Sequence, residues 1–365
     1  MTARILVVAG ARPNFMKVAP VLAALTGRGV AHGLVHTGQH YDDAMSDAFF
    51  RDLAIRAPDW HLGVGSASHA VQTARVMEAF ERVLVSERPE WVVVVGDVNS
   101  TLACALVAAK LPGIRIAHVE AGLRSGDWTM PEEVNRVLTD RLSHLLLTPS
   151  RDAEQNLMRE GIDRSRIRFA GNVMIDTLLR LLPRARARGL PESLAPDRDR
   201  FVVATVHRPS NVDHAERLQV ILRALGELAG ERRVLLPLHP RTLSRIREFG
   251  LQPLLERLDV REPCGYLEML ALQDAAALVV TDSGGLQEES TVLGVPCLTL
   301  RESTERPVTV SEGTNTLVPW PPTVDGIVVA AIQAMRRGRV PVGAAAPEGW
   351  DGRAGERAVD AILAS

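Results

Sequence analysis

The chain has 365 residues, which is more than one hydrophobic core usually serves, so the sequence predicts two domains. Apolar residues make up 46% and charged residues 24%, as in ordinary globular proteins, and the formal net charge of -2 gives no basic surface for nucleic acid. No apolar run approaches the roughly 20 residues of a membrane span, so we expect neither a nucleic-acid nor a membrane partner.

The first half alternates short β-branched runs with longer helical stretches. It opens on a short apolar run that we interpret as a buried strand and not as a signal peptide. We expect strands at residues 5–9, 33–36, 91–95, 115–119, 145–147 and 166–170. We expect helices at residues 70–86, 100–110 and 152–160. Continuous apolar strands between helices are typical of a parallel, doubly wound sheet.

A Pro- and Arg-rich stretch at residues 182–200 predicts a surface segment near the domain junction. Beyond it we expect strands at 201–206, 233–237, 278–281 and 297–300, and a last helix at 353–363. The sequence therefore predicts an α/β protein with two doubly wound, Rossmann-like domains facing a cleft. The first would span residues 1–172 and the second 173–350, with the C-terminal helix 351–365 packed back on the first.

The three cysteines, Cys104, Cys264 and Cys297, are scattered, and no two stand at metal-ligand spacing. The sequence predicts free thiols, no metal site and a cytoplasmic protein, because a reducing compartment keeps such thiols unpaired. Gly63 and Gly65 lack the third glycine of the dinucleotide fingerprint, so we expect no nicotinamide cofactor.

A glycine-containing turn follows the first strand and runs from Gly10 to Lys17. It carries Arg12 and Lys17, whose positive charges suit an anionic ligand beyond the carboxyl end of the strand. A second candidate ligand site follows the strand at 278–281, where a predicted helix begins with Ser283, Gly284 and Gly285. Exposed N–H groups and the helix dipole favour a phosphate there.

Glu289 lies one turn inside that second helix, where a carboxylate would repel a diphosphate. We expect it to accept hydrogen bonds from ribose hydroxyls instead. His207 and His239 follow the first two strands of the second half, at matched positions, which favours a functional role for both. Arg306 follows the strand at 297–300, and its guanidinium can neutralise a phosphate.

Carboxylates gather at the strand ends of the first half. Asp97 and Glu120 each follow a buried strand, and Pro131 begins a helix that places Glu132 and Glu133 in its first turn. Carboxylates that converge in a partly desolvated site can divide acid and base roles between them. The sequence therefore predicts an enzyme that carries out proton transfer.

Together these motifs closely resemble the non-hydrolysing UDP-N-acetylglucosamine 2-epimerases, in the family's order from Gly10 to about Val318. The motifs are GARP with Lys17, GD-x-x-S/T-T, HVEAGLR, PEE-x-NR, HR, DSGGLQEE and TERP. The resemblance implies a GT-B-like fold of the glycogen phosphorylase and UDP-glycosyltransferase type, with UDP held mainly by the second half. It also implies a homodimer without a cofactor that serves cell-surface polysaccharide biosynthesis.

The resemblance implies roles for single residues as well. Arg12 and Lys17 would contact the nucleotide-sugar from the first half, and Met269 would lie near the uracil. UDP would be held by His239, Ser283, Gly284, Gly285, Glu289 and Arg306. The catalytic positions would be Asp97, Glu120, Glu132 and His207, with Glu132 as the family's match in the Glu132–Glu133 pair.

The chemistry of such an epimerase fits this inventory. The C2 proton of a hexosamine is hardly acidic, so C2 cannot invert without an activating step. Loss of UDP across C1–C2 would give a 2-acetamidoglucal, to which UDP re-adds after inversion. This route needs a base at C2, an acid on the opposite face and stabilisation of the departing diphosphate. The sequence leaves base and acid unassigned among the four catalytic positions.

Two stretches depart from many bacterial members of the family. Gln39 to Met45 replaces a QHREM motif and His207 to Asn211 replaces HRRE, so activation by a second UDP-N-acetylglucosamine does not follow from the resemblance. Such variants also occur in epimerases of modified UDP-sugars, including 2,3-diacetamido uronic acids. The remaining alternatives are a hydrolysing epimerase, a GT-B glycosyltransferase and a non-catalytic UDP-sugar-binding module.

Overall fold

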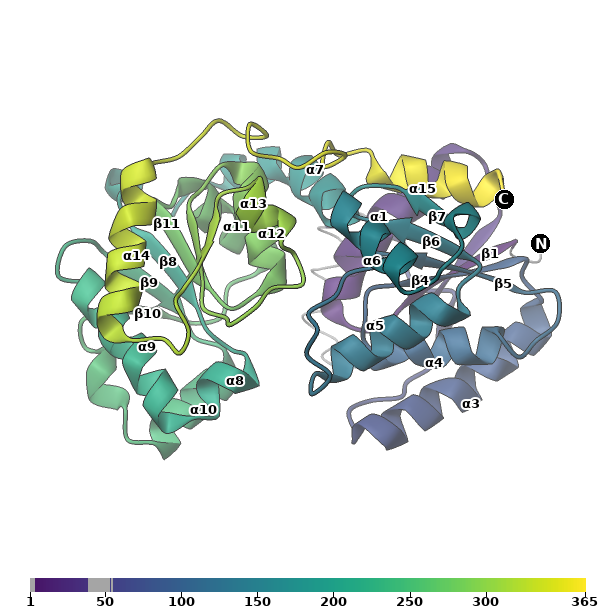
Figure 1. The fold of residues 1–365 in the computed structure, drawn as a ribbon, viewed down its shortest axis with the longest axis horizontal. Coiled ribbons are helices and arrows are strands. Elements are labelled where there is room, and N and C mark those ends of the chain that lie inside the picture. The colour runs from purple at the N-terminus through teal and green to yellow at the C-terminus, as the bar shows by residue number, and fades with distance from the viewer. Residues whose placement is uncertain (1–3, 39–52, 54) are drawn as a thin grey trace. The chain divides into compact units, whose positions relative to one another are not determined.

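The computed structural model describes residues 4–38, 53 and 55–365, without the side chains of Arg12, Pro13 and Pro196. The departure noted at residues 39–45 lies outside these residues. The chain divides into two compact units: unit 1 is Met1–Arg180 with Glu348–Ser365, and unit 2 is Leu181–Pro347. The division falls inside helix α7 (Val173–Arg188), so residues 182–188 of the expected surface segment are helical (Figure 1).

Within the described residues, unit 1 contains a seven-stranded parallel sheet in the order β3-β2-β1-β4-β5-β6-β7. Its strands are β1 (Ile5–Ala9), β2 (His32–His36), β3 (Trp60–His61), β4 (Trp91–Val95), β5 (Arg115–Val119), β6 (Leu145–Thr148) and β7 (Ile167–Phe169). All five side chains of β4, a tryptophan and four valines, are buried, as expected for a sheet covered on both faces. The strand order reverses between β1 and β4, and ligands of doubly wound sheets bind at the carboxyl ends of strands at such a switch point.

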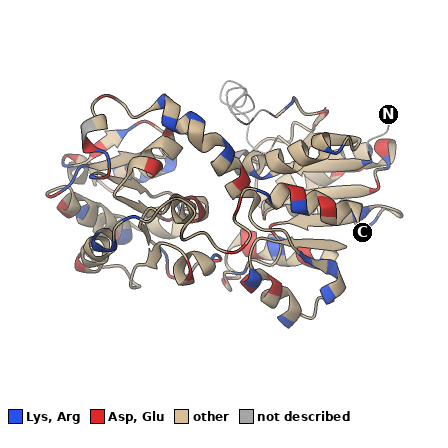
Figure 2. Ribbon diagram, turned by 90° about the horizontal axis from the view of Figure 1, so that it is seen from above, with Lys and Arg blue, Asp and Glu red and all other residues tan. Residues whose placement is uncertain are grey.

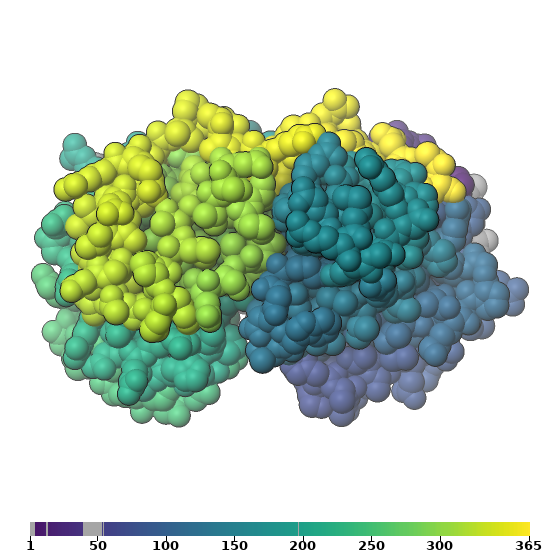
Figure 3. Space-filling model, in the orientation of Figure 1, coloured from purple at the N-terminus to yellow at the C-terminus, as the bar shows by residue number. Residues whose placement is uncertain are grey.

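The helices of unit 1 are α1 (Arg12–Gly27), α3 (His69–Glu87), α4 (Asn99–Ala108), α5 (Pro131–Leu142), α6 (Arg151–Arg159), the 3-10 turn η1 (Arg164–Arg166) and the C-terminal α15 (Ala354–Leu363). Helix α15 packs against α1. A Cβ on Gly355 would lie 2.7 Å from the carbonyl carbon of Pro20, so glycine permits this close approach. Figure 3 shows the C-terminal residues, in yellow, on the outside of unit 1.

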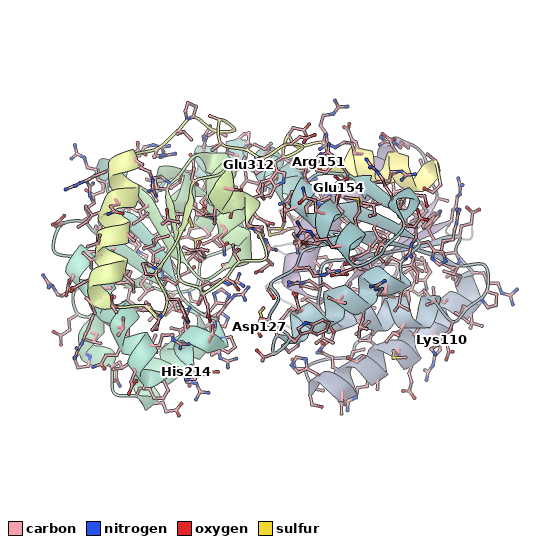
Figure 4. The ribbon with its side chains drawn as sticks, viewed as in Figure 1. Lys110, Asp127, Arg151, Glu154, His214 and Glu312 are labelled. Atoms are coloured by element: carbon pink, nitrogen blue, oxygen red, sulfur yellow. The ribbon has the colours of Figure 1, made fainter. Side chains whose placement is uncertain are left out.

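Specific contacts fasten the C-terminal segment to unit 1. Trp350 donates its indole N–H to the carbonyl oxygen of Pro149 at 2.9 Å. Glu348 forms an ion pair with Arg151 at 2.6 Å, and Arg151 also pairs with Glu154 on α6 at 3.0 Å (Figure 4). The last residues are therefore an integral part of unit 1.

The described part of unit 2 contains a six-stranded parallel sheet in the order β10-β9-β8-β11-β12-β13. Its strands are β8 (Val202–Thr205), β9 (Val234–Pro237), β10 (Asp259–Arg261), β11 (Leu278–Thr281), β12 (Cys297–Thr299) and β13 (Asn315–Leu317). Its helices are α8 (Pro209–Val212), α9 (Ala215–Leu228), α10 (Pro240–Glu248), α11 (Tyr266–Ala275), α12 (Gly284–Leu293), α13 (Val308–Ser311) and α14 (Val324–Arg337), with the 3-10 turns η2 (Ala195–Asp197) and η3 (Gln252–Leu255). Here the strand order reverses between β8 and β11.

The surface carries charges of both signs, interspersed along the ribbons of both units (Figure 2). None of the described helices combines the length and the apolar character that a membrane crossing requires. In the part of the chain that the structure describes, no group of three or more His, Cys, Asp or Glu side chains could hold a metal ion.

Candidate active site

Asn14 anchors the turn between β1 and α1. Its Oδ1 accepts the backbone N–H groups of Gly10 at 3.2 Å and Ala11 at 3.0 Å, and its Nδ2 donates to the carbonyl oxygen of Val95 at 3.1 Å. Val95 ends β4, so one buried side chain ties this turn to the neighbouring strand end across the switch point.

Lys17 and Glu120 meet beside Gly96. Their side chains, 10% and 5% exposed, form an ion pair between Nζ and Oε2. A Cβ on Gly96 would lie 3.2 Å from Nζ of Lys17 and 3.3 Å from Oε2 of Glu120. Glu120 has a φ of 72°, a left-handed conformation that strains a non-glycine residue and occurs often at functional sites.

Asp97 follows Gly96 and is held by Arg136 of α5, with 2.5 Å between Oδ2 and Nη2. The same guanidinium pairs with Glu133 at 2.7 Å. Glu133 is buried and also accepts the backbone N–H groups of residues 125–126, so its carboxylate is committed to this loop. Glu132, one residue earlier, is exposed at the start of the helix. Glu132 is therefore the solvent-exposed carboxylate of the two, and its catalytic role stays a prediction.

A buried ion pair connects the segments that carry these carboxylates. Nδ1 of His118 lies 2.6 Å from Oδ1 of Asp140, and Nε2 lies 2.8 Å from the carbonyl oxygen of Gly96. Asp140 also accepts the N–H of Gly122 at 3.1 Å and pairs with Arg124 at 2.8 Å. Burial alone would raise the pKa of Asp140, but the charges of His118 and Arg124 lower it below its usual value. These contacts fix the ends of β4 and β5 and helix α5 relative to one another.

In unit 2, the predicted phosphate cradle opens α12 at residues 283–285. A Cβ on Gly284 would lie only 2.6 Å from Nη1 of Arg306, so the guanidinium lies directly beside the helix N-terminus. Nε of Arg306 donates to Glu288 at 2.6 Å, and Nη1 pairs with Glu305. Burial alone would raise the pKa of Glu305, but the charge of Arg306 lowers it well below its usual value.

Glu289 lies on α12 and is 3% exposed. The hydroxyl of Tyr266 donates to its Oε1 at 3.0 Å, and the amide of Gln273 donates to its Oε2 at 2.7 Å. Burial raises the pKa of Glu289 to about 7, and these hydrogen bonds offset only part of the effect. Met269 has the helical spacing that places it on the same face of α11 as Tyr266 and Gln273.

His207 follows β8, and its Nδ1 lies 3.1 Å from Oδ1 of the buried Asp282. His239 follows β9 as the N-cap of α10, with its Nδ1 accepting the N–H of Arg241 at 3.2 Å. The two imidazole centroids are 5.8 Å apart. Burial and the neighbouring positive charges lower the pKa of His239.

The structure gathers most of the predicted residues into two groups, one near each switch point, while Glu132 is exposed at the start of α5 and no described contact joins it to either group. In unit 1, Lys17 meets Glu120 directly, and the site of Asp97 is continuous with theirs through Gly96. In unit 2, the start of α12 meets Arg306, His207 meets His239, and Met269 shares a helix face with the partners of Glu289. Arg12 begins α1, but its side chain lies outside the described part.

Sequence reasoning missed the residues that hold these groups in place. They are Asn14, His118, Arg136, Asp140, Tyr266, Gln273 and Asp282. Most of them lie inside or next to the predicted motifs. The signal that could have identified them is a polar side chain in a segment whose other residues are apolar and predicted to be buried.

Comparison with known proteins identifies a family to which this chain is similar. The model of the UDP-N-acetylglucosamine 2-epimerase family matches residues 23–363. The UDP-N-acetylglucosamine 2-epimerase of Methanocaldococcus jannaschii is 43% identical over 321 residues, which cover 86% of this chain and 87% of that protein. The UDP-2,3-diacetamido-2,3-dideoxy-D-glucuronate 2-epimerase of Pseudomonas aeruginosa is 44% identical over 319 residues, covering 86% of this chain and 88% of its own.

Solved structures agree. The Methanocaldococcus jannaschii UDP-GlcNAc 2-epimerase in complex with UDP-GlcNAc and UDP matches with a TM-score of 0.87 and 39% identity, covering 99% of both chains. A glycosyltransferase from Rickettsia africae, 12% identical over 98% of this chain and 94% of its own, shares the fold alone, with a TM-score of 0.55.

The chain belongs to the UDP-N-acetylglucosamine 2-epimerase family, whose enzymes are isomerases acting on carbohydrates. The resemblance read from the motifs is thereby confirmed. So is the predicted α/β fold with two parallel sheets of the GT-B kind. The roles of single residues stay predictions.

Proposed function

We propose that this chain is a non-hydrolysing UDP-N-acetylglucosamine 2-epimerase, which interconverts UDP-N-acetylglucosamine and UDP-N-acetylmannosamine. The observation that carries the proposal is the complementary chemistry of the two switch points. Unit 1 offers carboxylates held by cations, as Glu120 is by Lys17 and Asp97 by Arg136. Unit 2 offers a helix N-terminus beside Arg306, which suits a diphosphate.

Unit 2 binds UDP in this scheme. The backbone N–H groups of Gly284 and Gly285 at the start of α12 and the guanidinium of Arg306 take the diphosphate, since both present donors to an anion. Ser283 contributes its hydroxyl. Glu289 accepts the ribose hydroxyls, and Tyr266 orients it. Met269 lies against the uracil, and His239 adds a further donor to the phosphates.

The reaction then proceeds in two steps. The C1–O bond breaks with its electron pair on the diphosphate while the C2 proton passes to a base, giving a 2-acetamidoglucal. The C1–O bond forms again while C2 takes a proton on its other face from an acid. Asp97, Glu120, Glu132 and His207 share the roles of base and acid. No oxidant takes part, so no cofactor is needed.

Proton NMR in deuterated water tests the proposal. The purified protein is incubated with UDP-N-acetylglucosamine, and the product is expected to be the manno epimer of the intact UDP-sugar, with deuterium at C2. A product that keeps hydrogen at C2 rejects the elimination scheme. Release of free N-acetylmannosamine would identify a hydrolysing enzyme instead.

A second candidate is 2-epimerisation of a UDP-2,3-diacetamido uronic acid. It is supported by the Pseudomonas aeruginosa relative, which is 44% identical to this chain, whereas the Methanocaldococcus jannaschii UDP-N-acetylglucosamine 2-epimerase is 43% identical. Sequence identity therefore does not distinguish the two substrates. A panel of both UDP-sugars separates them, because the true substrate is expected to show the higher kcat/KM by at least tenfold, or about 1.4 kcal/mol.

We also propose that the enzyme works in the cytoplasm as a homodimer and supplies cell-surface polysaccharide biosynthesis. The free thiols of Cys104, Cys264 and Cys297 suit a reducing compartment. The dimer and the pathway rest on the family resemblance. Light scattering behind size exclusion, at several protein concentrations, tests the dimer: a constant mass of one chain would reject it.

A further inference from the structure

Asp282 is a carboxylate with no exposed surface at the carboxyl end of β11. Strand β11 pairs in parallel with β8, which brings Asp282 beside the turn that starts at His207. Its Oδ2 accepts the backbone N–H groups of His207 at 3.0 Å and Arg208 at 2.9 Å, and the side-chain amide of Asn211 at 3.0 Å. Its Oδ1 faces Nδ1 of the His207 ring at 3.1 Å.

These partners fix the charge of the carboxyl group. Backbone N–H groups and a side-chain NH₂ can only donate, so Oδ2 serves as an acceptor for all of them. Burial alone would raise the pKa of Asp282, but the hydrogen bonds from His207, Arg208 and Asn211 lower it below its usual value. Oδ1 also accepts the backbone N–H of His207, at 3.2 Å, so both oxygens act as acceptors. Asp282 is therefore ionised, and the group that faces Oδ1 from the ring is a donor.

The ring of His207 is that donor, so its Nδ1 carries a proton in both the neutral and the charged state. The nitrogen that gains and loses a proton is consequently Nε2. The side chain is 40% exposed, so a ligand can reach the ring. The same reasoning assigns the tautomer of a neutral histidine whenever one ring nitrogen faces an ionised carboxylate.

His239 has the opposite arrangement. Its Nδ1 accepts the backbone N–H of Arg241 at 3.2 Å, so Nδ1 carries a lone pair and the proton of the neutral ring sits on Nε2. Burial, and after it the positive charges of His207 and Arg241, lower the pKa of His239 and keep the ring neutral. Two histidines with centroids 5.8 Å apart therefore present different nitrogens.

We propose that Asp282 is a positioning residue that makes Nε2 of His207 the proton-transferring nitrogen, while His239 stays neutral and donates from its own Nε2. The proposal deepens the proposed function and rests on it. In the two-step reaction, one proton leaves C2 and one returns on the other face, and His207 exchanges its Nε2 proton in one of these transfers. His239 takes no proton and only donates a hydrogen bond to the anionic part of the ligand.

Two groups of the described residues face the His207 ring from neighbouring strand ends. The ionised Asp282 faces it from the end of β11, and the neutral His239 faces it from the end of β9. Asp282 is the negatively charged group that faces the ring, and it accepts from Nδ1.

The first test is Asp282→Asn, which keeps the shape of the side chain. The amide oxygen can still accept from Arg208 and Asn211, so the NH₂ group turns toward the ring and makes Nδ1 of His207 an acceptor. The proton of the neutral ring then moves to Nε2. We expect kcat to fall about 10²- to 10⁴-fold, as when a catalytic histidine is held in the wrong tautomer, while the Kd for UDP changes less than about threefold.

A matched control is Asp274→Asn, the same substitution in the same unit. Asp274 is 1% exposed and pairs with Arg186 and Arg198, and no histidine is among these partners. It lies near the end of α11, just before β11, and hence at the opposite edge of the sheet from Asp282. We expect this variant to keep kcat within about twofold, and an equal loss in both variants would overturn the proposal.

A double-mutant cycle separates positioning from a general structural effect. In the background of His207→Gln, whose own kcat is reduced, Asp282→Asn is expected to lower kcat by less than about twofold, because there is no ring left to orient. A structural role predicts the same fold-loss in both backgrounds, and that outcome would overturn the proposal.

A readout on the wild-type protein needs neither a variant nor turnover. Correlation spectra of ¹⁵N-labelled histidine side chains distinguish a neutral ring protonated on Nδ1 from one protonated on Nε2. We expect His207 to be of the first kind and His239 of the second. If His207 proves to be protonated on Nε2 alone, the proposal fails while the epimerase assignment stands. If no UDP-sugar is epimerised but the spectra are as expected, the function fails and the tautomers stand.

Discussion

The two units have the same kind of sheet and place polar groups at the same kind of switch point, yet their electrostatics differ. In unit 1, strand ends present carboxylates, and the cations Lys17 and Arg136 come from the flanking helices α1 and α5. In unit 2, the end of β11 leads into the N-terminus of α12, and the carboxylates Glu288 and Glu305 form ion pairs with the cation Arg306. The arrangement of unit 1 suits proton transfer by carboxylates, and that of unit 2 suits an anion beside the imidazole of His207.

This difference teaches that topology locates a site but does not decide its chemistry. Parallel strands bring several loop starts to one edge of a sheet in both units. What each loop start contributes depends on single residues, such as Asp97 after β4 and Ser283 after β11. Substitutions of the unit 1 carboxylates should therefore change kcat, as should those of His207 and Asp282, and substitutions at the start of α12 should change the affinity for UDP.

The largest effect is expected for Asp97→Asn and Glu120→Gln. Either change removes a proton-transferring group while keeping its shape, so kcat should fall on the order of 10²- to 10⁴-fold. The Kd for UDP should stay within about threefold, because UDP is assigned to unit 2. Steady-state kinetics and calorimetric titration with UDP measure the two quantities. A variant that binds UDP and keeps full turnover would remove its residue from the catalytic set.

The sequence predicted most of the fold because core strands are continuous apolar runs. Strands β1, β4, β5 and β11 begin and end at the predicted residues. The strands it missed are β3, β10 and β13, which are all edge strands of two or three residues. Edge strands carry little buried apolar surface, so no hydrophobic run marks them.

The site was predictable to a lesser degree. Motif residues at strand ends could be chosen by residue type and position, but their partners could not. Asp97 and Arg136 are 39 residues apart, and His207 and Asp282 are 75 apart. Such pairs depend on the strand register and on the placement of α5, neither of which one sequence reveals.

The next largest effect concerns the cations of unit 1. Arg136→Met leaves Asp97 and the buried Glu133 without their shared guanidinium, so the free energy of unfolding should fall by about 3–5 kcal/mol. Arg353→Met is the control, because Arg353 and Glu356 form an exposed pair that should contribute no more than about 1 kcal/mol. Urea unfolding measures both, and equal losses would show that Arg136 is not a structural centre of unit 1.

Unit 2 has its own titrating carboxylate, Glu289. Burial raises its pKa from 4.5 to about 7, so the unfolded chain ionises first as the pH rises. Stability is therefore lost between about pH 4.5 and pH 7, by on the order of 3 kcal/mol. Glu289→Gln removes this loss, because both Tyr266 and Gln273 can reorient toward an amide.

Unfolding curves at pH 4.5 and pH 8 test this expectation. The variant should gain stability relative to the wild type as the pH rises across that window, and it should bind UDP with a weaker pH dependence. If the wild type and the Glu289→Gln variant have the same free energy of unfolding at both pH values, burial does not hold this carboxylate protonated.

The smallest effect is expected for Gly284→Ala, and it tests whether Arg306 needs its place at the start of α12. The new Cβ would lie 2.6 Å from Nη1 and 2.9 Å from Cζ of Arg306, so the guanidinium must move although Glu288 and Glu305 hold it. We expect the Kd for UDP to rise about tenfold, or 1.4 kcal/mol, with little change in kcat at saturation. Gly226→Ala in α9 is the control, because a Cβ there meets nothing within 4 Å and a helix interior favours alanine by roughly 0.5–1 kcal/mol. If both variants bind UDP like the wild type, the diphosphate does not bind at this helix N-terminus, and the division of labour between the units loses its basis.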